Sequence, residues 1–139
     1  MAYLLDTNWL IQLLAGHKET ATFHRHLHPE TIAVSFITVG EIYDVAFAYA
    51  NPQAHLSSFR QFLAPFTLLN LNDPIMERFA DIRSLLRRRG ELIADFDILI
   101  GATVLQYDLA LLTYNTRHFK CIPDLKFYPP AAYSGSQKD

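Results

Sequence analysis

The stretch that decides the fold is Tyr3-Leu4-Leu5-Asp6-Thr7-Asn8, a short apolar run that ends in one acid and leads into polar residues. Three apolar residues are too few for a helix, whereas the residues after Asp6 have the apolar spacing of a helix over 7–15. Short apolar runs of the same kind recur along the chain, at 32–35, 67–69, 109–113 and 126–128. We therefore expect several short strands with helices between them.

Helical patterns separate most of these runs. They predict helices over 7–15, 36–49, 52–63, 74–89 and 96–107. The helix over 74–89 has clear ends, because Asn72 and Pro74 are typical of a helix start and Gly90 of a helix stop. Strands that alternate with helices favour an α/β fold with a parallel sheet covered on both faces. Such sheets bind ligands beyond the carboxyl ends of their strands.

Length and composition indicate one globular domain over residues 1–133 of the 139, with a short polar tail at 134–139. Half of the residues are apolar and 19% are charged, which excludes a disordered chain. The single cysteine, Cys121, excludes a disulfide framework, and no apolar run is long enough to span a membrane. We expect a cytoplasmic protein. The net charge of −2 argues against a protein that coats nucleic acid through general basicity.

Asp6 directly follows the first predicted strand. One interpretation is an N-cap for the helix that begins at Thr7, because aspartate is a favoured capping residue. The other is a ligand at the sheet edge where sites form. Both interpretations place the carboxylate at that edge.

Glu41 lies in the segment 36–47, which is apolar on almost every side and therefore predicts a largely buried helix. No lysine or arginine stands three or four residues away to pair with it. Burying an unpaired carboxylate is costly unless it is neutralised or meets a cation. Glu41 is therefore either turned to solvent near the helix start or part of a cation site.

Asp95 and Asp97 precede a second apolar helical segment, residues 98–105. Because they are two residues apart, they cannot share one face of a helix. One can cap the helix while the other projects from its first turn. We assign the cap to Asp95 and the site to Asp97, and the reverse assignment, or a part for both, stays open.

Asp6, Glu41 and Asp97 would repel one another at a single sheet edge unless a cation neutralised them. Their oxygen atoms suit hard ions such as Mg²⁺ or Mn²⁺. Such an ion lowers the pKa of a bound water, orients a phosphate and stabilises the charge on a leaving oxygen. The three acids therefore predict a metal site that hydrolyses phosphodiester bonds.

Four motifs of the chain resemble, in order, those of PIN-domain nucleases, and the likeness is greatest to the VapC-type toxins of toxin–antitoxin pairs. The first three are Leu4 to Asn8, Gly40-Glu41-Ile42 and Asp95 to Val104. The fourth is Leu112-Thr113-Tyr114-Asn115-Thr116-Arg117-His118-Phe119. The likeness extends from Tyr3 to about Phe127, and an ordered set of four motifs is far more specific than any one of them.

The resemblance implies a three-layer α/β/α PIN-like fold with a parallel central sheet, and Mg²⁺- or Mn²⁺-dependent cleavage of RNA. It also implies two protein partners, a cognate antitoxin and a second copy of the chain in a homodimer. The family's metal-binding acids correspond to Asp6, Glu41 and Asp97, and Asn115 stands at a fourth catalytic position where many relatives have aspartate. Positions beside the metal or the phosphate correspond to Thr7, Asp95, Thr113 and Arg117. Gly101 stands where relatives more often have alanine, a difference that we expect to affect packing only slightly.

Two other functions compete with RNA cleavage. A phosphotransferase would form an aspartyl-phosphate on Asp6, but Asn8 stands where haloacid dehalogenases have a second aspartate. A non-catalytic binding module on the same fold is the other alternative. The retention of all three acids argues against it, because nothing else in the apolar helices requires them.

The helices also carry more apolar residues than one small sheet face needs, around Trp9, Tyr43, Phe47 and Tyr49. Exposed apolar patches usually mark protein interfaces. We therefore expect these residues to contact a second copy of the chain or the antitoxin.

Overall fold

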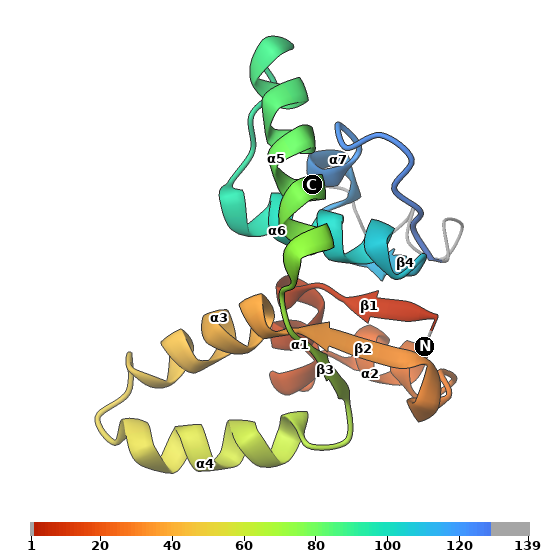
Figure 1. Ribbon diagram of the computed structural model, residues 1–139. Coiled ribbons are helices and arrows are strands. Elements are labelled where there is room, and N and C mark those ends of the chain that lie inside the picture. Colours follow the sequence, from red (N-terminus) through yellow and green to blue (C-terminus); the bar gives the residue numbers. More distant parts are fainter. Residues whose placement is uncertain (1, 129–139) are drawn as a thin grey trace.

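A parallel sheet of four short strands forms the centre of the computed structural model, which describes residues 2–128 (Figure 1). The strands are β1 (Tyr3–Leu5), β2 (Ile32–Ser35), β3 (Thr67–Leu69) and β4 (Ala110–Leu112), in the order β3-β2-β1-β4. Each coincides with a predicted apolar run. The fifth predicted strand, at 126–128, is wrong, because this segment forms only an isolated bridge between Phe127 and Leu111 beside β4.

Seven helices connect and cover the strands within the described residues. They are α1 (Thr7–Leu14), α2 (Lys18–His24), α3 (Phe36–Ala46), α4 (Pro52–Leu63), α5 (Asp73–Arg88), α6 (Asp95–Gln106) and α7 (Thr116–Phe119), with a 3-10 turn η1 at Pro29–Thr31. The helix predicted over 36–49 ends at Ala46, where Ala48 and Tyr49 donate tighter i−3 bonds instead. Sequence reasoning missed α2 and α7, which are too short to give a clear helical period.

Side chains alternate along each strand between two hydrophobic clusters, one on each face of the sheet. Leu4 and Leu111 pack with α5, α6 and α7, whereas their neighbours Leu5 and Leu112 pack with α1, α3 and α4. Burying a leucine side chain of this kind contributes about 1.5–3 kcal/mol. The two clusters make the expected three-layer α/β/α fold, in which helices cover both faces of the sheet (Figure 1).

The strand order reverses at β1. From β1 the chain adds β2 and β3 on one side, and β4 then pairs with the other side of β1. In a parallel sheet such a reversal parts the connections beyond the carboxyl ends of the two strands and leaves room for a ligand. Asp6 directly follows β1 and Thr113 directly follows β4, so both stand at this place.

The ends predicted for α5 are confirmed. The Asn72 side chain accepts a hydrogen bond of 3.0 Å from the Ile75 amide, which caps the helix start. Gly90 follows the helix with a φ of +67°, a conformation that glycine adopts without strain. No helix within residues 2–128 is long and apolar enough to cross a membrane. The predicted tail at 134–139 lies outside the described residues.

Only some of the apolar side chains that we expected to form a protein interface are exposed. Trp9 is 2% exposed and stacks on Tyr114 with ring centroids 5.0 Å apart, so its expected place in an interface is wrong. Tyr43 is half-buried, and the Arg60 guanidinium lies 5.0 Å above its ring. Exposed apolar surface remains beyond the end of α3, at Phe47 and Tyr49.

Candidate active site

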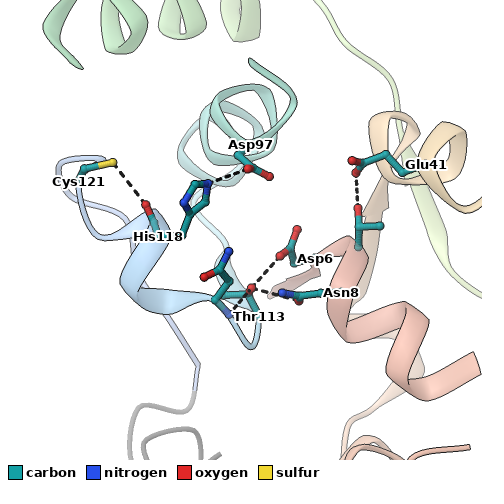
Figure 2. Close-up of polar contacts among 9 residues, drawn as sticks. Asp6, Asn8, Glu41, Asp97, Thr113, His118 and Cys121 are labelled. Atoms are coloured by element: carbon teal, nitrogen blue, oxygen red, sulfur yellow. Dashed lines mark hydrogen bonds and ion pairs between the residues drawn. The ribbon is translucent and has the colours of Figure 1, made fainter. Parts of the chain in front are cut away.

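Asp6 is the most buried acid in the described part of the chain, with 4% of its surface exposed. It occupies the N-cap position of α1, but its side chain makes no capping bond. The carboxylate instead faces the end of β4, where the Thr113 hydroxyl donates a hydrogen bond of 2.7 Å to Oδ2 (Figure 2). Asp6 therefore stands at the cap position without capping the helix through its side chain, and its carboxylate lies at the sheet edge.

Thr113 joins three segments at this edge. Its Oγ1 accepts a hydrogen bond of 2.9 Å from the Asn115 amide while it donates to Asp6. Asn8 lies 3.3 Å from the same oxygen, and its Oδ1 also accepts from the Tyr114 amide at 3.3 Å. A hydroxyl has a single proton, and the shorter contact to a carboxylate takes it in preference to the amide oxygen.

Glu41 reaches the same edge from α3. Its Oε1 accepts a hydrogen bond of 2.5 Å from the Thr7 hydroxyl, which also lies 3.0 Å from that of Thr38. Glu41 is half-buried and forms no ion pair within the described residues. The contact with Thr7, the residue after Asp6, ties this carboxylate to the site and argues against the solvent-facing alternative.

Asp97 projects from the first turn of α6, and its Oδ2 lies 2.9 Å from His118 Nε2 on α7. Both side chains are partly buried, at 25% and 33% exposure. The motif at 112–119 contains His118, but its pattern does not mark this residue as part of the site. The contact joins residues 21 positions apart and depends on how α7 packs against α6, which no local pattern reveals.

The other predicted residues have separate surroundings. Asp95 forms an ion pair of 2.7 Å with Arg83 on α5, and Ala94 occupies the N-cap of α6 without a side-chain bond. The cap assigned to Asp95 is therefore wrong, because Asp95 is the first residue of α6 and its carboxylate pairs with Arg83 instead. Asn115 is exposed at the N-cap of α7, and its side chain makes no capping bond. Arg117 is exposed and forms no ion pair within the described residues.

The electrostatics of the site centre on Asp6. The pKa of its carboxyl group is raised to about 6, mainly by burial and also by the negative charges of Asp97 and Glu41. Hydrogen bonds from Thr113 and from the Thr7 backbone oppose this rise in pKa. No lysine or arginine of residues 2–128 forms an ion pair with any of the three acids. The site therefore gathers three carboxyl groups that no lysine or arginine of the described residues pairs with.

The carboxylate oxygens of Asp6, Glu41 and Asp97 are suitable ligands for a hard divalent cation. The three side chains do not, however, converge on a single point. Within residues 2–128, no group of three His, Cys, Asp or Glu side chains is arranged to hold a metal ion as it stands. Mg²⁺, however, keeps several of its waters and needs only one or two protein carboxylates. Figure 2 shows Asp6 between Asp97 and Glu41, and Thr113 holds one of its two carboxylate oxygens, Oδ2.

Comparison with known proteins agrees with this architecture. Ribonuclease VapC2 of Haemophilus influenzae is 28% identical over 126 residues, which cover 91% of this chain and 96% of that protein. The tRNA(fMet)-specific endonuclease VapC of Salmonella typhimurium is 24% identical, with the same coverage of both chains.

Solved structures give the same result. A chain of VapBC-1 from nontypeable Haemophilus influenzae superposes with a TM-score of 0.81 at 28% identity, over 91% of this chain and 96% of that one. A chain of FitAcB from Neisseria gonorrhoeae superposes with a TM-score of 0.80 at 27% identity, over 91% and 97%. Residues 3–125 match the family described as PIN domain, which is most of the sequence. The chain therefore belongs to the PIN-domain family.

Proposed function

We propose that this protein is a divalent-metal-dependent endoribonuclease and the toxin of a toxin–antitoxin pair. The observation that carries the proposal is the burial of Asp6 between Asp97 and Glu41, with no lysine or arginine of the described residues paired to any of the three acids. Such a cluster is stable at neutral pH once a cation enters it. The chain matches relatives over nearly their whole length, and these relatives are named ribonucleases, which supports RNA as the substrate.

Asp6 and Asp97 would hold the cation directly, and Glu41 would hold it directly or through a water. When bound, Mg²⁺ or Mn²⁺ supplies an activated water and positive charge beside the leaving oxygen of a phosphodiester. Thr113 donates to one oxygen of the Asp6 carboxylate and Thr7 to one oxygen of Glu41, so the other oxygen of each would bind the ion. Arg117, which is exposed on α7, would contact a backbone phosphate of the substrate.

Asn115 adds an amide oxygen but no charge at the fourth position. An amide oxygen is a weaker ligand for a hard cation than a carboxylate, so this side of the site holds a second ion poorly. We therefore propose that one tightly bound cation supports cleavage, with Asn115 contributing to the position of its waters.

The test is cleavage of a mixed RNA pool and of single-stranded DNA of matched length, with Mg²⁺, with Mn²⁺ and with EDTA. We expect RNA fragments with internal ends only when a divalent cation is present, and little DNA cleavage. Metal binding without cleavage would support the binding-module alternative instead. A stable phosphoryl group on Asp6 after incubation with a phosphate donor would support the phosphotransferase.

The partner proteins that we propose are a second copy of the chain and a small antitoxin. Apolar side chains exposed on the described surface support both, among them Phe47 at 61% and Phe96 at 51%. Light scattering at micromolar concentration should give the mass of a dimer, and a monomer would contradict that part alone. Expression without an antitoxin should slow growth, and growth arrest that persists undiminished in Asp6→Asn would contradict the toxin.

A further inference from the structure

The segment from Thr113 to His118 contacts two of the three acids. Thr113, at its start, donates to Asp6 Oδ2, and His118, near its end, contacts Asp97 Oδ2 at 2.9 Å (Figure 2). Asp6 and Asp97 come from different elements, the end of β1 and the first turn of α6. Both carboxylates therefore owe their orientation to one short stretch of chain that follows β4.

This segment is anchored independently of the acids. Phe119, the residue after His118, is fully buried in the cluster formed with α5 and α6. The Cys121 thiol donates to the His118 carbonyl at 3.4 Å, and the Asn115 amide donates to Thr113 Oγ1. A four-residue helix has little stability of its own, so the buried phenylalanine fixes α7 and with it the imidazole.

The contact also defines the hydrogen-bond roles of the imidazole. A carboxylate oxygen accepts, so the imidazole tautomer that fits this contact carries its proton on Nε2 and donates to Asp97 Oδ2. This bond takes up one oxygen of Asp97 and sets the rotation of the carboxylate, which leaves Oδ1 for other partners. Carboxylates that bind metals are commonly held by such a bond, and losing it typically costs about 10- to 100-fold in metal affinity.

We propose that His118 is a positioning residue of the cation site, which acts by holding Asp97 in the orientation that binds the ion. The inference rests on the proposed function only in taking Asp97 as a cation ligand. His118 is neither a ligand nor the group that transfers a proton to the RNA. Its effect passes entirely through Asp97, and a glutamine, whose amide N–H can donate to the same oxygen, can replace it in part.

The experiment is calorimetric titration of the full-length protein with Mn²⁺, without RNA, for the wild type, His118→Phe and His118→Gln. We expect about a tenfold or greater loss of affinity in His118→Phe and a loss within about threefold in His118→Gln. His28→Phe, at an exposed position of the same chain, is the matched control and should bind Mn²⁺ like the wild type. Thermal unfolding of each variant identifies any that fails to fold, and His118→Gln keeps the test valid if His118→Phe is one of them.

A double substitution separates positioning from direct binding. In an Asp97→Ala background, His118→Phe should cause no further loss of Mn²⁺ affinity, because no carboxylate is left for the residue to orient. An equal loss in both backgrounds, or a large loss in His118→Gln, would mean that His118 binds the ion itself and would overturn the proposal. Unchanged Mn²⁺ affinity in His118→Phe would also overturn it, whether or not cleavage falls.

These outcomes are distinct from failure of the proposed function. A wild-type protein that binds Mn²⁺ in the manner described but cleaves no RNA would contradict the nuclease and leave the role of His118 intact. If the wild type cleaves RNA but all His118 variants bind Mn²⁺ equally well, the role of His118 is contradicted and the nuclease stands. A wild-type protein that binds no Mn²⁺ would overturn both.

Discussion

The Thr113 hydroxyl donates a hydrogen bond of 2.7 Å to the Asp6 carboxylate, although the two residues are 107 positions apart in the chain. Each stands directly after a strand, and β1 and β4 pair in register from Tyr3 with Ala110 to Leu5 with Leu112. The strand pairing therefore places the donor opposite the acid. The bond therefore ties the pairing of β1 with β4 to the most buried acid of the site.

Removing this donor should destabilise the protein at neutral pH. Thr113→Val keeps the shape of the side chain but leaves the buried Asp6 carboxylate without its hydroxyl partner, a loss of about 1–3 kcal/mol in the free energy of unfolding. Thr103→Val is the matched control, because Thr103 is equally buried but donates to the neutral carbonyl of Leu99. Urea unfolding at pH 7 measures both, and equal losses would contradict a special contribution from the Asp6 contact.

The stability of the metal-free protein should fall as the pH rises from about 4 to about 6. The pKa of Asp6 is raised to about 6 in the folded protein from an ordinary value of 3.8. The folded state therefore binds a proton more tightly than the unfolded state, and its stabilisation is present below pH 4 and lost as pH passes 6. The effect is on the order of 1–3 kcal/mol for this buried group.

Asp6→Asn should abolish this pH dependence and raise the melting temperature at pH 7 in EDTA. The asparagine oxygen can still accept from Thr113, so only the charge is removed. Asp81→Asn, at an exposed position of α5, serves as the control and should change neither quantity. Melting curves from pH 4 to pH 7 decide the matter, and an Asp6→Asn curve parallel to that of the wild type would assign the pH dependence to another group.

Asn115 should influence metal binding without being essential. Asn115→Asp adds a charge at the fourth position and should tighten Mn²⁺ binding, whereas Asn115→Ala should lower RNA cleavage less than Asp97→Asn does. Calorimetry on the variants measures the first effect and initial cleavage rates the second. If the aspartate variant bound Mn²⁺ no better than the wild type, Asn115 would lie beyond the reach of the ion.

Gly101 and Ile122 should be coupled in stability. A Cβ atom at position 101 would lie 2.6 Å from the Ile122 Cδ1 atom, so the glycine matters more for packing than the sequence suggested. Gly101→Ala should add about 0.5–1 kcal/mol of stability in an Ile122→Val background, where that methyl group is absent. In the wild-type background the gain should be smaller or reversed. The same change in unfolding free energy in both backgrounds would rule out the contact.

Much of the fold could be predicted because its signals are local. The apolar run Tyr3-Leu4-Leu5 and the capping pair Asn72 and Pro74 each carry their structural meaning within a few residues. The segment around Phe127 was predicted to be a strand but forms only an isolated bridge, because both have the same short apolar pattern in the sequence. The short helices α2 and α7 were not predicted, because a helix of fewer than two turns shows no clear period of apolar residues.

The candidate site was predictable as a set of acids but not as a network. Asp6, Glu41 and Asp97 stood out because each is a charge beside or within an apolar segment. The residues that contact these acids could not be predicted in the same way. Asp95 pairs with Arg83 on α5, and Asp97 contacts His118 on α7. Both contacts join different helices, so they depend on helix packing that the spacing of residues in the sequence does not reveal.

The most direct test of the central claim is the rate of RNA cleavage by the wild type and by Asp6→Asn across a Mn²⁺ titration. Partners that hold a metal ligand typically contribute about 10- to 100-fold, so loss of a ligand itself should cost more than about a hundredfold. The account predicts that wild-type cleavage rises with Mn²⁺ and stops in EDTA, while folded Asp6→Asn stays inactive at every concentration. Cleavage by Asp6→Asn at the wild-type rate, or wild-type cleavage that persists in EDTA, would contradict it.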